Sequence, residues 1–440
     1  MPDKINRREF IGLTGTGLAA LSLPREVFGK TGGRLRGGTA KVNINPPVGC
    51  WLSGWEIREK PSEGVADNLY AKAIVLSDGT TEVAIVSADL IGVTAEIVSA
   101  VRDSARRQTG IPGGNVLIAA THTHFGPVIK EYKFDSRVDP SYLKVLEGKL
   151  ASLIKTAHDN MTGIRVGSAK GRAPELLYNR RMKNKEGRAV MTFALPPENP
   201  ELSFGPTDPE VGVIRVEDTE GKLLASMINF ACHPVSGGGH GEGWKSWFYH
   251  ISADYPAYAV QVVEQIEGGN CLFTLGTAGD MVPIKRGISP RFEIGRALGG
   301  EALRRLQLMP VAEEVSLAAV QKMVDLPLKA EVPDNANEEL EPGKTAIAAE
   351  IQGIRIGDTV LVGLPGEVLV ELGLEIKNKA GMEKLFLLSM SNDSIGYICH
   401  AAAYDEGGYE SGRGTNLARG AGEIVVREAL KVIKQLKDGV

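Results

Sequence analysis

Short apolar runs alternate with helix-like segments along most of this chain. Residues 70–79 and 82–93 are rich in Val, Ile and Ala, and the first range ends in Asp78-Gly79, which predicts two strands joined by a tight turn. Residues 94–110 place apolar side chains at helical spacing, and residues 115–124 return to a strand-like pattern. Strand, helix and strand in this order predict a βαβ unit with parallel strands in a largely buried sheet.

The rest of the chain continues the same mixture of patterns. We expect further helices at 141–160, 255–269 and 420–437, and strands within 164–173, 211–234, 270–280, 350–367 and 384–393. Glu220-Gly221 predicts a hairpin turn, and polar residues 333–345 are interpreted as an exposed insertion. The expected fold class is α/β, with mixed sheets and flanking helices in one large domain over residues 35–440.

Residues 1–34 are interpreted as an export signal and linker, outside that domain. Arg7 and Arg8 precede Phe10 and a weakly apolar Gly/Ala/Leu segment that is too short to cross a bilayer. This order is typical of twin-arginine signals. The alternative, an ordinary basic N-terminus before a helix, does not account for the aromatic and apolar residues that follow. We therefore predict a periplasmic or secreted protein without a membrane span once the signal is removed.

The charge balance narrows the choice of partners. Fifty Lys and Arg residues face 54 Asp and Glu residues, and no basic run follows the N-terminal segment. Neither nucleic acid nor an anionic membrane surface is favoured, so we expect a small-molecule substrate. The four cysteines are widely spaced without a Cys-x-x-Cys pair, which favours free buried thiols over disulfides.

Two histidines end one of the predicted strands. The stretch "NVLIAATHTHFGP" (115–127) carries His122 and His124, although the chain has seven histidines in all. Residues two apart in an extended strand project to the same face, so both imidazoles are expected to face one cleft. The alternative is a pair of hydrogen-bonded core histidines, which is less favoured because each buried imidazole needs its own partners.

Three other apolar runs also end in a polar group, at His233, Asp280 and Glu367. Zinc binds imidazole nitrogen and carboxylate oxygen, and catalytic zinc sites keep one position open for water. His122, His233 and Glu367 would supply such a set. Asp67 and Asp89 are candidate hydrogen-bond partners for the histidine nitrogens, and capping or solvated roles for both remain open.

These motifs resemble the N-terminal catalytic domain of the neutral/alkaline, non-lysosomal ceramidase family. "THTHFGP" is similar to the family's Thr-His-Thr-His-Ser-Gly-Pro, and "NFACHP" to its Trp-Phe-Ala-Val-His-Pro. "PGE" matches its Pro-Gly-Glu, and "GYESG" is similar to its Tyr-Glu-Gly/Ala segment. The resemblance runs from about Gly38 to the end in the same order. It implies hydrolysis of an amide bond in an N-acylated, lipid-like substrate.

The resemblance also implies roles for individual residues. Zinc would be bound by His122, His233, Glu367 and Tyr409. His124 would face the scissile group as a hydrogen-bonding or acid/base residue, and Arg180 of "YNRR" would bind the reacting carbonyl. Asp280 is a candidate general base, with a structural turn role equally open.

The sequence departs from the family at one motif. The family's Asn-x-Gly-Asp-Val-Ser-Pro-Asn reads "TAGDMVPI" here, with Val282 at the serine and Ile284 at the last asparagine. Without that hydroxyl, hydrolysis is expected to use metal-activated water. Because the sequence stops at Val440, we expect a divergent bacterial-type member without the family's C-terminal immunoglobulin-like domain. Two alternatives remain open: an esterase or other small-molecule hydrolase on the same metal site, or a non-catalytic metal- or ligand-binding homologue.

Overall fold

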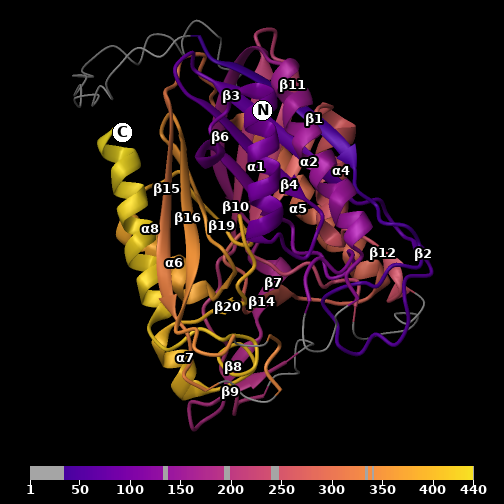
Figure 1. The fold of residues 1–440 in the computed structure, drawn as a ribbon, viewed down its shortest axis with the longest axis vertical. Coiled ribbons are helices and arrows are strands. Elements are labelled where there is room, and N and C mark those ends of the chain that lie inside the picture. The colour runs from indigo at the N-terminus through magenta and orange to yellow at the C-terminus, as the bar shows by residue number, and fades with distance from the viewer. Residues whose placement is uncertain are drawn as a thin grey trace, which may run out of the picture. The chain divides into compact units, whose positions relative to one another are not determined.

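Two β-sheets pack face to face, and helices cover the outer face of each (Figure 1). This computed structural model describes residues 34–131, 137–192, 199–238, 247–331, 335–338 and 341–439. The predicted export signal, apart from Arg34, lies outside the described residues. The described residues all belong to one unit, Thr31–Val440.

The first sheet has eight strands and the second has four, counted over the described residues. The order in the first sheet is β13 (Asn270–Leu275), β11 (Leu223–Phe230), β10 (Glu210–Asp218), β6 (Thr162–Arg172), β1 (Arg36–Asn43), β3 (Tyr70–Ser77), β4 (Glu82–Ala88) and β5 (Val116–Ala120). The order in the second is β15 (Leu317–Pro327), β16 (Ala346–Ile356), β17 (Thr359–Gly363) and β19 (Leu385–Leu388). The pairs β4–β5, β11–β13 and β17–β19 are parallel, and the other neighbouring strands are antiparallel.

Short strand pairs and single turns complete the described structure. The pairs are β2 (Gly64–Val65) with β12 (His250–Ile251), β7 (Leu177–Asn179) with β14 (Met281–Pro283), β8 (Arg181–Lys183) with β9 (Ala189–Met191), and β18 (Glu367–Val368) with β20 (Tyr397–Ile398). Two 3₁₀ turns lie at η1 (Gly113–Asn115) and η2 (Pro174–Leu176).

Alternating side chains divide the core into layers. In β3, Ala73 and Val75 face the cluster shared with the outer helices, whereas Ile74 and Leu76 face the second sheet. The helices on the first sheet are α1 (Ala95–Thr109), α2 (Pro140–Asp159), α4 (Tyr255–Glu267) and α5 (Ile288–Leu308). On the second sheet they are α6 (Val370–Ala380) and α8 (Ala421–Asp438), and the short α7 (Ala401–Glu406) precedes α8. Both sheets are therefore apolar on both faces, which explains the nearly continuous apolar runs of the sequence.

The predicted α/β class and its first motif are confirmed. Strand β4, helix α1 and strand β5 form the βαβ unit, in which Thr94 caps α1 by accepting from the Ile97 amide and Gly110 ends it at φ +85°. The β3–β4 and β10–β11 hairpins are also present. All four cysteines are free, and Cys232, Cys271 and Cys399 are buried, as favoured. Within the described ranges, none of the helices has the length and apolar character needed to cross a bilayer.

Helix α5 was not predicted from the sequence. Its Gly295 and Gly299 lie against the backbone of α4, where an added Cβ would come within 2.6 Å of the carbonyl oxygens of Tyr255 and Ala259. Glycine lowers helix propensity by about 1 kcal/mol relative to alanine, which weakens the sequence signal. The close α4–α5 packing compensates for it, and only the folded structure contains that packing.

A buried polar network ties strand β5 to the second sheet. Arg102 of α1 makes a bidentate ion pair with Glu350 of β16, with both N–O distances 2.7 Å. Asn392 donates to the Glu350 carboxylate and accepts from the Ile118 amide of β5, at 2.9 Å in both cases. The network therefore fixes the strand that leads directly to His122.

We expect Glu350→Ala to lower the free energy of unfolding by about 3–5 kcal/mol, because it leaves the buried Arg102 without its carboxylate. Urea denaturation measures this change. The control is Lys344→Ala in the exposed Lys344–Glu341 pair, where we expect a loss below about 1 kcal/mol. A loss from Glu350→Ala no larger than that of the control would contradict the assigned role of the network.

Candidate metal centre

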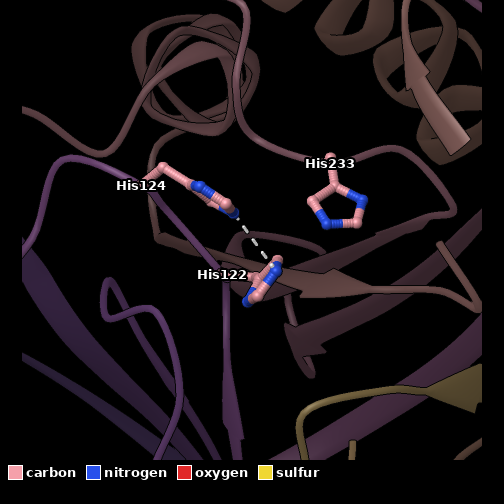
Figure 2. A group of neighbouring side chains, drawn as sticks. All are labelled: His122, His124 and His233. Atoms are coloured by element: carbon pink, nitrogen blue, oxygen red, sulfur yellow. Dashed lines mark hydrogen bonds between the residues drawn. The ribbon is translucent and has the colours of Figure 1, made fainter. Parts of the chain in front are cut away.

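Three histidines from two distant parts of the chain converge at one point (Figure 2). One ring nitrogen each of His122, His124 and His233 lies within 4.8 Å of the other two. His122 and His124 follow β5, and His233 follows β11, so two strand ends of the first sheet supply the group. Among the described residues, these three histidines form the group whose ligand atoms lie close enough together to hold one metal ion.

The turn after β5, rather than the strand itself, brings His122 and His124 together. Strand β5 ends at Ala120, and His122 has a left-handed backbone with φ +68°, which is uncommon for a residue other than glycine. Strand alternation, the predicted reason why the two rings face the same way, therefore does not apply here. Their rings do meet, with centroids 4.9 Å apart. Backbone strain of this kind is typical of functional sites.

Each of the three imidazoles donates its Nδ1 proton to a backbone carbonyl. His122 Nδ1 lies 2.5 Å from the Ile91 oxygen, His124 Nδ1 lies 3.0 Å from the Gly54 oxygen, and His233 Nδ1 lies 2.5 Å from the Ala278 oxygen. A carbonyl only accepts, so Nδ1 carries the proton in each neutral ring and Nε2 carries a lone pair. The Nε2 atoms of all three rings are therefore free to bind a cation.

Gly54 is required for this arrangement. It has φ +94°, and a Cβ at this position would lie 2.5 Å from Nδ1 of His124. A side chain here would displace the imidazole that the Gly54 carbonyl orients. This role is not visible in the sequence, because an isolated glycine in a loop is usually no more than a turn residue.

Glu367 completes the group from the second sheet. It begins β18, just after β17, and its Oε2 lies 3.0 Å from Nε2 of His233 and 3.3 Å from Nε2 of His122. Gly279 permits this approach, since a Cβ there would lie 2.8 Å from the Glu367 carbonyl oxygen. Ends of strands from both sheets thus contribute groups that face one another.

Burial favours the neutral form of His124 and His233 in the metal-free protein. Burial lowers the pKa of His233 to about 4, and burial with the two neighbouring imidazoles holds the pKa of His124 well below its usual range. Burial opposes ionisation of Glu367, but the contacts with His122 and His233 outweigh it and hold the pKa of Glu367 well below its usual range. This lowering requires a positive charge, a proton or a metal ion, at the Nε2 atoms that face the carboxylate. Imidazole nitrogens without protons and a carboxylate are the form of these side chains that binds a metal ion.

A cation fits these donors on structural grounds. Nε2 of His122 and Nε2 of His124 are 3.3 Å apart, although both carry lone pairs in the neutral rings. Two lone pairs at this distance repel unless a proton or a metal ion lies near both. Imidazole with carboxylate is a donor set that suits zinc and several other first-row transition metals.

The structure places Arg180 and Tyr409 beside the histidine group. Both line a cavity of about 310 Å³ that also includes His124. Arg180 donates to the Glu410 carboxylate at 2.8 Å and to the Tyr397 hydroxyl at 3.0 Å. The Tyr409 hydroxyl accepts from Asn337 at 2.8 Å, and burial together with the nearby Glu367 charge raises the pKa of Tyr409 to about 12.

Asp280 lies behind the site rather than in its cavity. Its side chain is fully buried, accepts from the Val370 amide at 2.9 Å and from the Asn179 side chain at 2.8 Å, and does not line the cavity. Burial and the neighbouring Glu371 carboxylate raise the pKa of Asp280 to about 7. The sequence left two roles open for Asp280, general base and structural turn residue. Its position favours the structural role, because Asp280 joins the turn after β13 to the first residue of α6.

The suggestion that Asp67 and Asp89 support the histidines is wrong. Asp67 accepts from the Ala253 amide at 2.7 Å and from Ser252, and Asp89 accepts from the Tyr70 amide at 2.8 Å. Backbone carbonyls occupy the histidine Nδ1 positions instead. Carbonyls of this kind cannot be recognised from residue types, because every residue has one.

Sequence reasoning also missed Tyr397 and Asn337. Tyr397 is the register partner of Glu367 in the β18–β20 pair, and its hydroxyl lies against Arg180. Asn337 belongs to the polar stretch 333–345, which was predicted to be an exposed insertion, yet it binds the Tyr409 hydroxyl. That prediction is wrong at Asn337, which is partly buried and whose side chain amide has a distant partner that the local sequence does not show.

Val282, which stands at the family's serine position, belongs to an apolar cluster next to the cavity. Val282 is fully buried and packs in an apolar cluster with Tyr178 and Val235. Trp55 and Ile284 pack against the same cluster, and Trp55 and Val235 also line the cavity. The family's serine position thus supports an apolar wall in this chain.

Comparisons with known proteins give matches to a family model and to solved structures. Residues 38–281, more than half of the chain, match the family model of the N-terminal domain of neutral/alkaline non-lysosomal ceramidase. The matched range includes His122, His124 and His233 but ends before Glu367 and Tyr409.

The fold is similar to two solved structures. Neutral ceramidase from Pseudomonas aeruginosa matches with a TM-score of 0.73 and 18% identity, over 93% of this chain and 75% of that one. A ceramidase in complex with C2 matches with a TM-score of 0.72 and 18% identity, over 92% of this chain and 75% of that one. At this identity the likeness concerns the fold.

Folding lowers the pKa of His233 from 6.5 to about 4. We therefore expect the metal-free protein to lose stability as the pH falls through this range. In this window the unfolded chain protonates His233 and the folded chain does not, so the unfolded state binds more protons and the unfolding free energy falls with pH. The shift corresponds to about 3 kcal/mol from this side chain.

Urea denaturation across the same pH range, with chelator present, measures the effect. His233→Asn should make the dependence shallower. His158→Asn is the control, because His158 lies at the end of α2 with 25% of its side chain exposed. A stability that stays constant over this pH range in the unmodified protein would contradict the assigned environment of His233.

Proposed function

Since this chain belongs to the neutral/alkaline non-lysosomal ceramidase family, we propose that it is an exported, zinc-dependent hydrolase that cleaves the amide bond of an N-acylated substrate. The observation that carries the proposal is the convergence of three Nε2 lone pairs next to the Glu367 carboxylate. This group lies beside a cavity large enough for a small ligand.

His122, His233 and Glu367 would hold the metal ion, and Tyr409 is the proposed fourth ligand. The burial of His122 and His233 and the carbonyl partners of these two imidazoles support the assignment. When bound, zinc supplies a Lewis acid that polarises a carbonyl and lowers the pKa of water to about 7. The remaining steps depend on groups of the chain itself.

His124 and Arg180 are proposed to act on the substrate. Both line the cavity, and Nη1 of Arg180 makes no hydrogen bond to the described residues, whereas Nε and Nη2 are held by Glu410, Gly279 and Tyr397. A guanidinium fixed in this way can donate to the oxygen on which negative charge develops as the amide is attacked. His124 has its Nδ1 proton held by Gly54, so its Nε2 is available to exchange a proton with the reacting groups.

The apolar part of the cavity supports an acyl substrate. Trp55, Ile57, Met191 and Val235 line it together with the polar groups. These side chains offer contact surface for a hydrocarbon chain. An ester of the same acyl group would fit the same wall, so the esterase alternative differs in the bond that is cleaved rather than in the pocket.

Export is supported by the sequence alone. Arg7, Arg8 and Phe10 precede a short apolar segment, and these residues lie outside the described part of the chain. Cell fractionation tests this part of the proposal, which recovery of the protein only from the cytoplasm would contradict.

We expect zinc-loaded protein to hydrolyse N-acyl amides, to lose the activity on chelation and to regain it when zinc is returned. His233→Ala should lower the rate at fixed zinc about a hundredfold or more, because it removes a metal donor. His158→Ala, a matched histidine substitution outside the cavity, should retain the activity. Release of the free amine from a panel of N-acyl compounds measures the rate.

The same panel, extended to esters of the same acyl groups, separates the alternatives. Cleavage of esters without cleavage of amides would favour the esterase. Absence of any hydrolysis by protein that contains stoichiometric zinc would favour the non-catalytic homologue. Hydrolysis that is unaffected by chelation would contradict the metal dependence.

A further inference from the structure

The charged side chains around the cavity are mainly positive. Arg180, Arg286 and Arg413 line it, and Glu56 is the acidic residue in the described lining. Burial lowers the pKa of Arg286 to about 10, so this side chain is still cationic at neutral pH. Even with Arg286 left out of the count, two arginines stand against one carboxylate in the described lining, and a cavity wall with more cations than anions attracts an anionic ligand.

The charges behind Arg180 do not cancel this excess. Glu410 is shared, because its carboxylate accepts from both Arg180 and Arg181 at 2.8 Å. Arg181 is in turn paired with Glu406, which also binds Lys183. Three cations and two carboxylates therefore alternate in a row that begins at the cavity, in the order Arg180, Glu410, Arg181, Glu406 and Lys183. The row therefore retains one positive charge.

Arg413 is the arginine best placed to meet a substrate group. One of its terminal nitrogens, Nη1, is 2.9 Å from the Glu56 carboxylate, while Nε and Nη2 have no hydrogen-bond partner among the described residues. The guanidinium lies 5.1 Å from the centre of the Tyr409 ring, and the Arg413 carbonyl accepts from the Asn337 amide. The side chain is thus held beside Tyr409 with two nitrogens available.

Glu56 is a weak competitor for these nitrogens. The Glu56 and Arg413 side chains are 34% and 38% exposed. Ion pairs this exposed contribute little, since solvent and salt screen them. A carboxylate of a ligand whose apolar part is bound in the cavity can therefore replace or share this contact, and guanidinium binds carboxylate in a fixed two-point geometry.

We propose that the substrate is an N-acylated compound whose amine portion carries a carboxylate, and that Arg413 binds this carboxylate. The inference rests on the proposed amide hydrolysis and specifies its substrate class. An N-acylated amino alcohol has no charge to place beside Arg413. An N-acylated amino acid has one, and its acyl chain takes the apolar wall formed by Trp55 and Val235.

The test compares two substrates of the same shape, N-hexanoylglycine and its neutral counterpart N-hexanoylglycinamide, with zinc-loaded protein. We expect kcat/KM to be about tenfold or more higher for the carboxylate. Arg413→Gln should remove this preference by lowering kcat/KM for the carboxylate alone. Glu56→Gln should have the opposite effect and lower KM for the carboxylate, because it removes the competing anion. The second variant keeps the test decisive if Arg413→Gln folds poorly.

The outcomes separate this inference from the proposed function. Equal hydrolysis of both compounds, or a carboxylate preference that persists in Arg413→Gln, would overturn the inference and leave the amide hydrolase in place. If neither compound is hydrolysed, the proposed function fails, and calorimetric binding of both compounds to the zinc-loaded protein decides. Tighter binding of the carboxylate that Arg413→Gln abolishes supports carboxylate recognition by Arg413 without the hydrolysis, and equal binding overturns the inference.

Discussion

The orientation of three imidazole rings is the constraint on which the site depends. Backbone carbonyls of Ile91, Gly54 and Ala278 hold the Nδ1 protons of His122, His124 and His233, so each Nε2 lone pair points into the same small volume. Carbonyl groups cannot donate, which fixes the tautomer as well as the ring direction. Rotation of any ring would break its hydrogen bond to a backbone carbonyl and withdraw one donor from the group.

The packing of the two sheets holds the histidines and Glu367 in position. Strands β5 and β11 of the first sheet and β17 of the second deliver His122, His233 and Glu367, and a buried network through Arg102 and Asn392 fastens β5 to the second sheet. Cores on both faces of each sheet hold these strand ends in place. The neighbouring cavity joins the metal group to an apolar wall and a set of arginines. The proposed chemistry and the proposed substrate selection therefore use the same strand ends and loops.

Sequence patterns predicted the parts that local periodicity encodes. The βαβ unit, both hairpins and the α/β class follow from alternation and turn residues, and the polar strand ends pointed to His122, His233 and Glu367. Helix α5 was missed because its glycines suit tight packing on α4 rather than an isolated helix. The partners of the histidines were missed because they are carbonyls, which residue types do not reveal. His122 shows a further limit: its left-handed backbone, not strand alternation, aims the ring. The roles of Tyr409, His124 and Arg180 stay predictions that rest on the family resemblance and on their places around the cavity.

X-ray diffraction from zinc-loaded crystals, with data collected on both sides of the zinc absorption edge, would locate the metal ion relative to these rings. We expect one anomalous peak about 2.0–2.2 Å from Nε2 of His122, Nε2 of His233 and a carboxylate oxygen of Glu367, with the Nδ1 atoms still bonded to their carbonyls. A zinc peak elsewhere, or one bound through Nδ1 of these rings, would contradict the proposed metal centre.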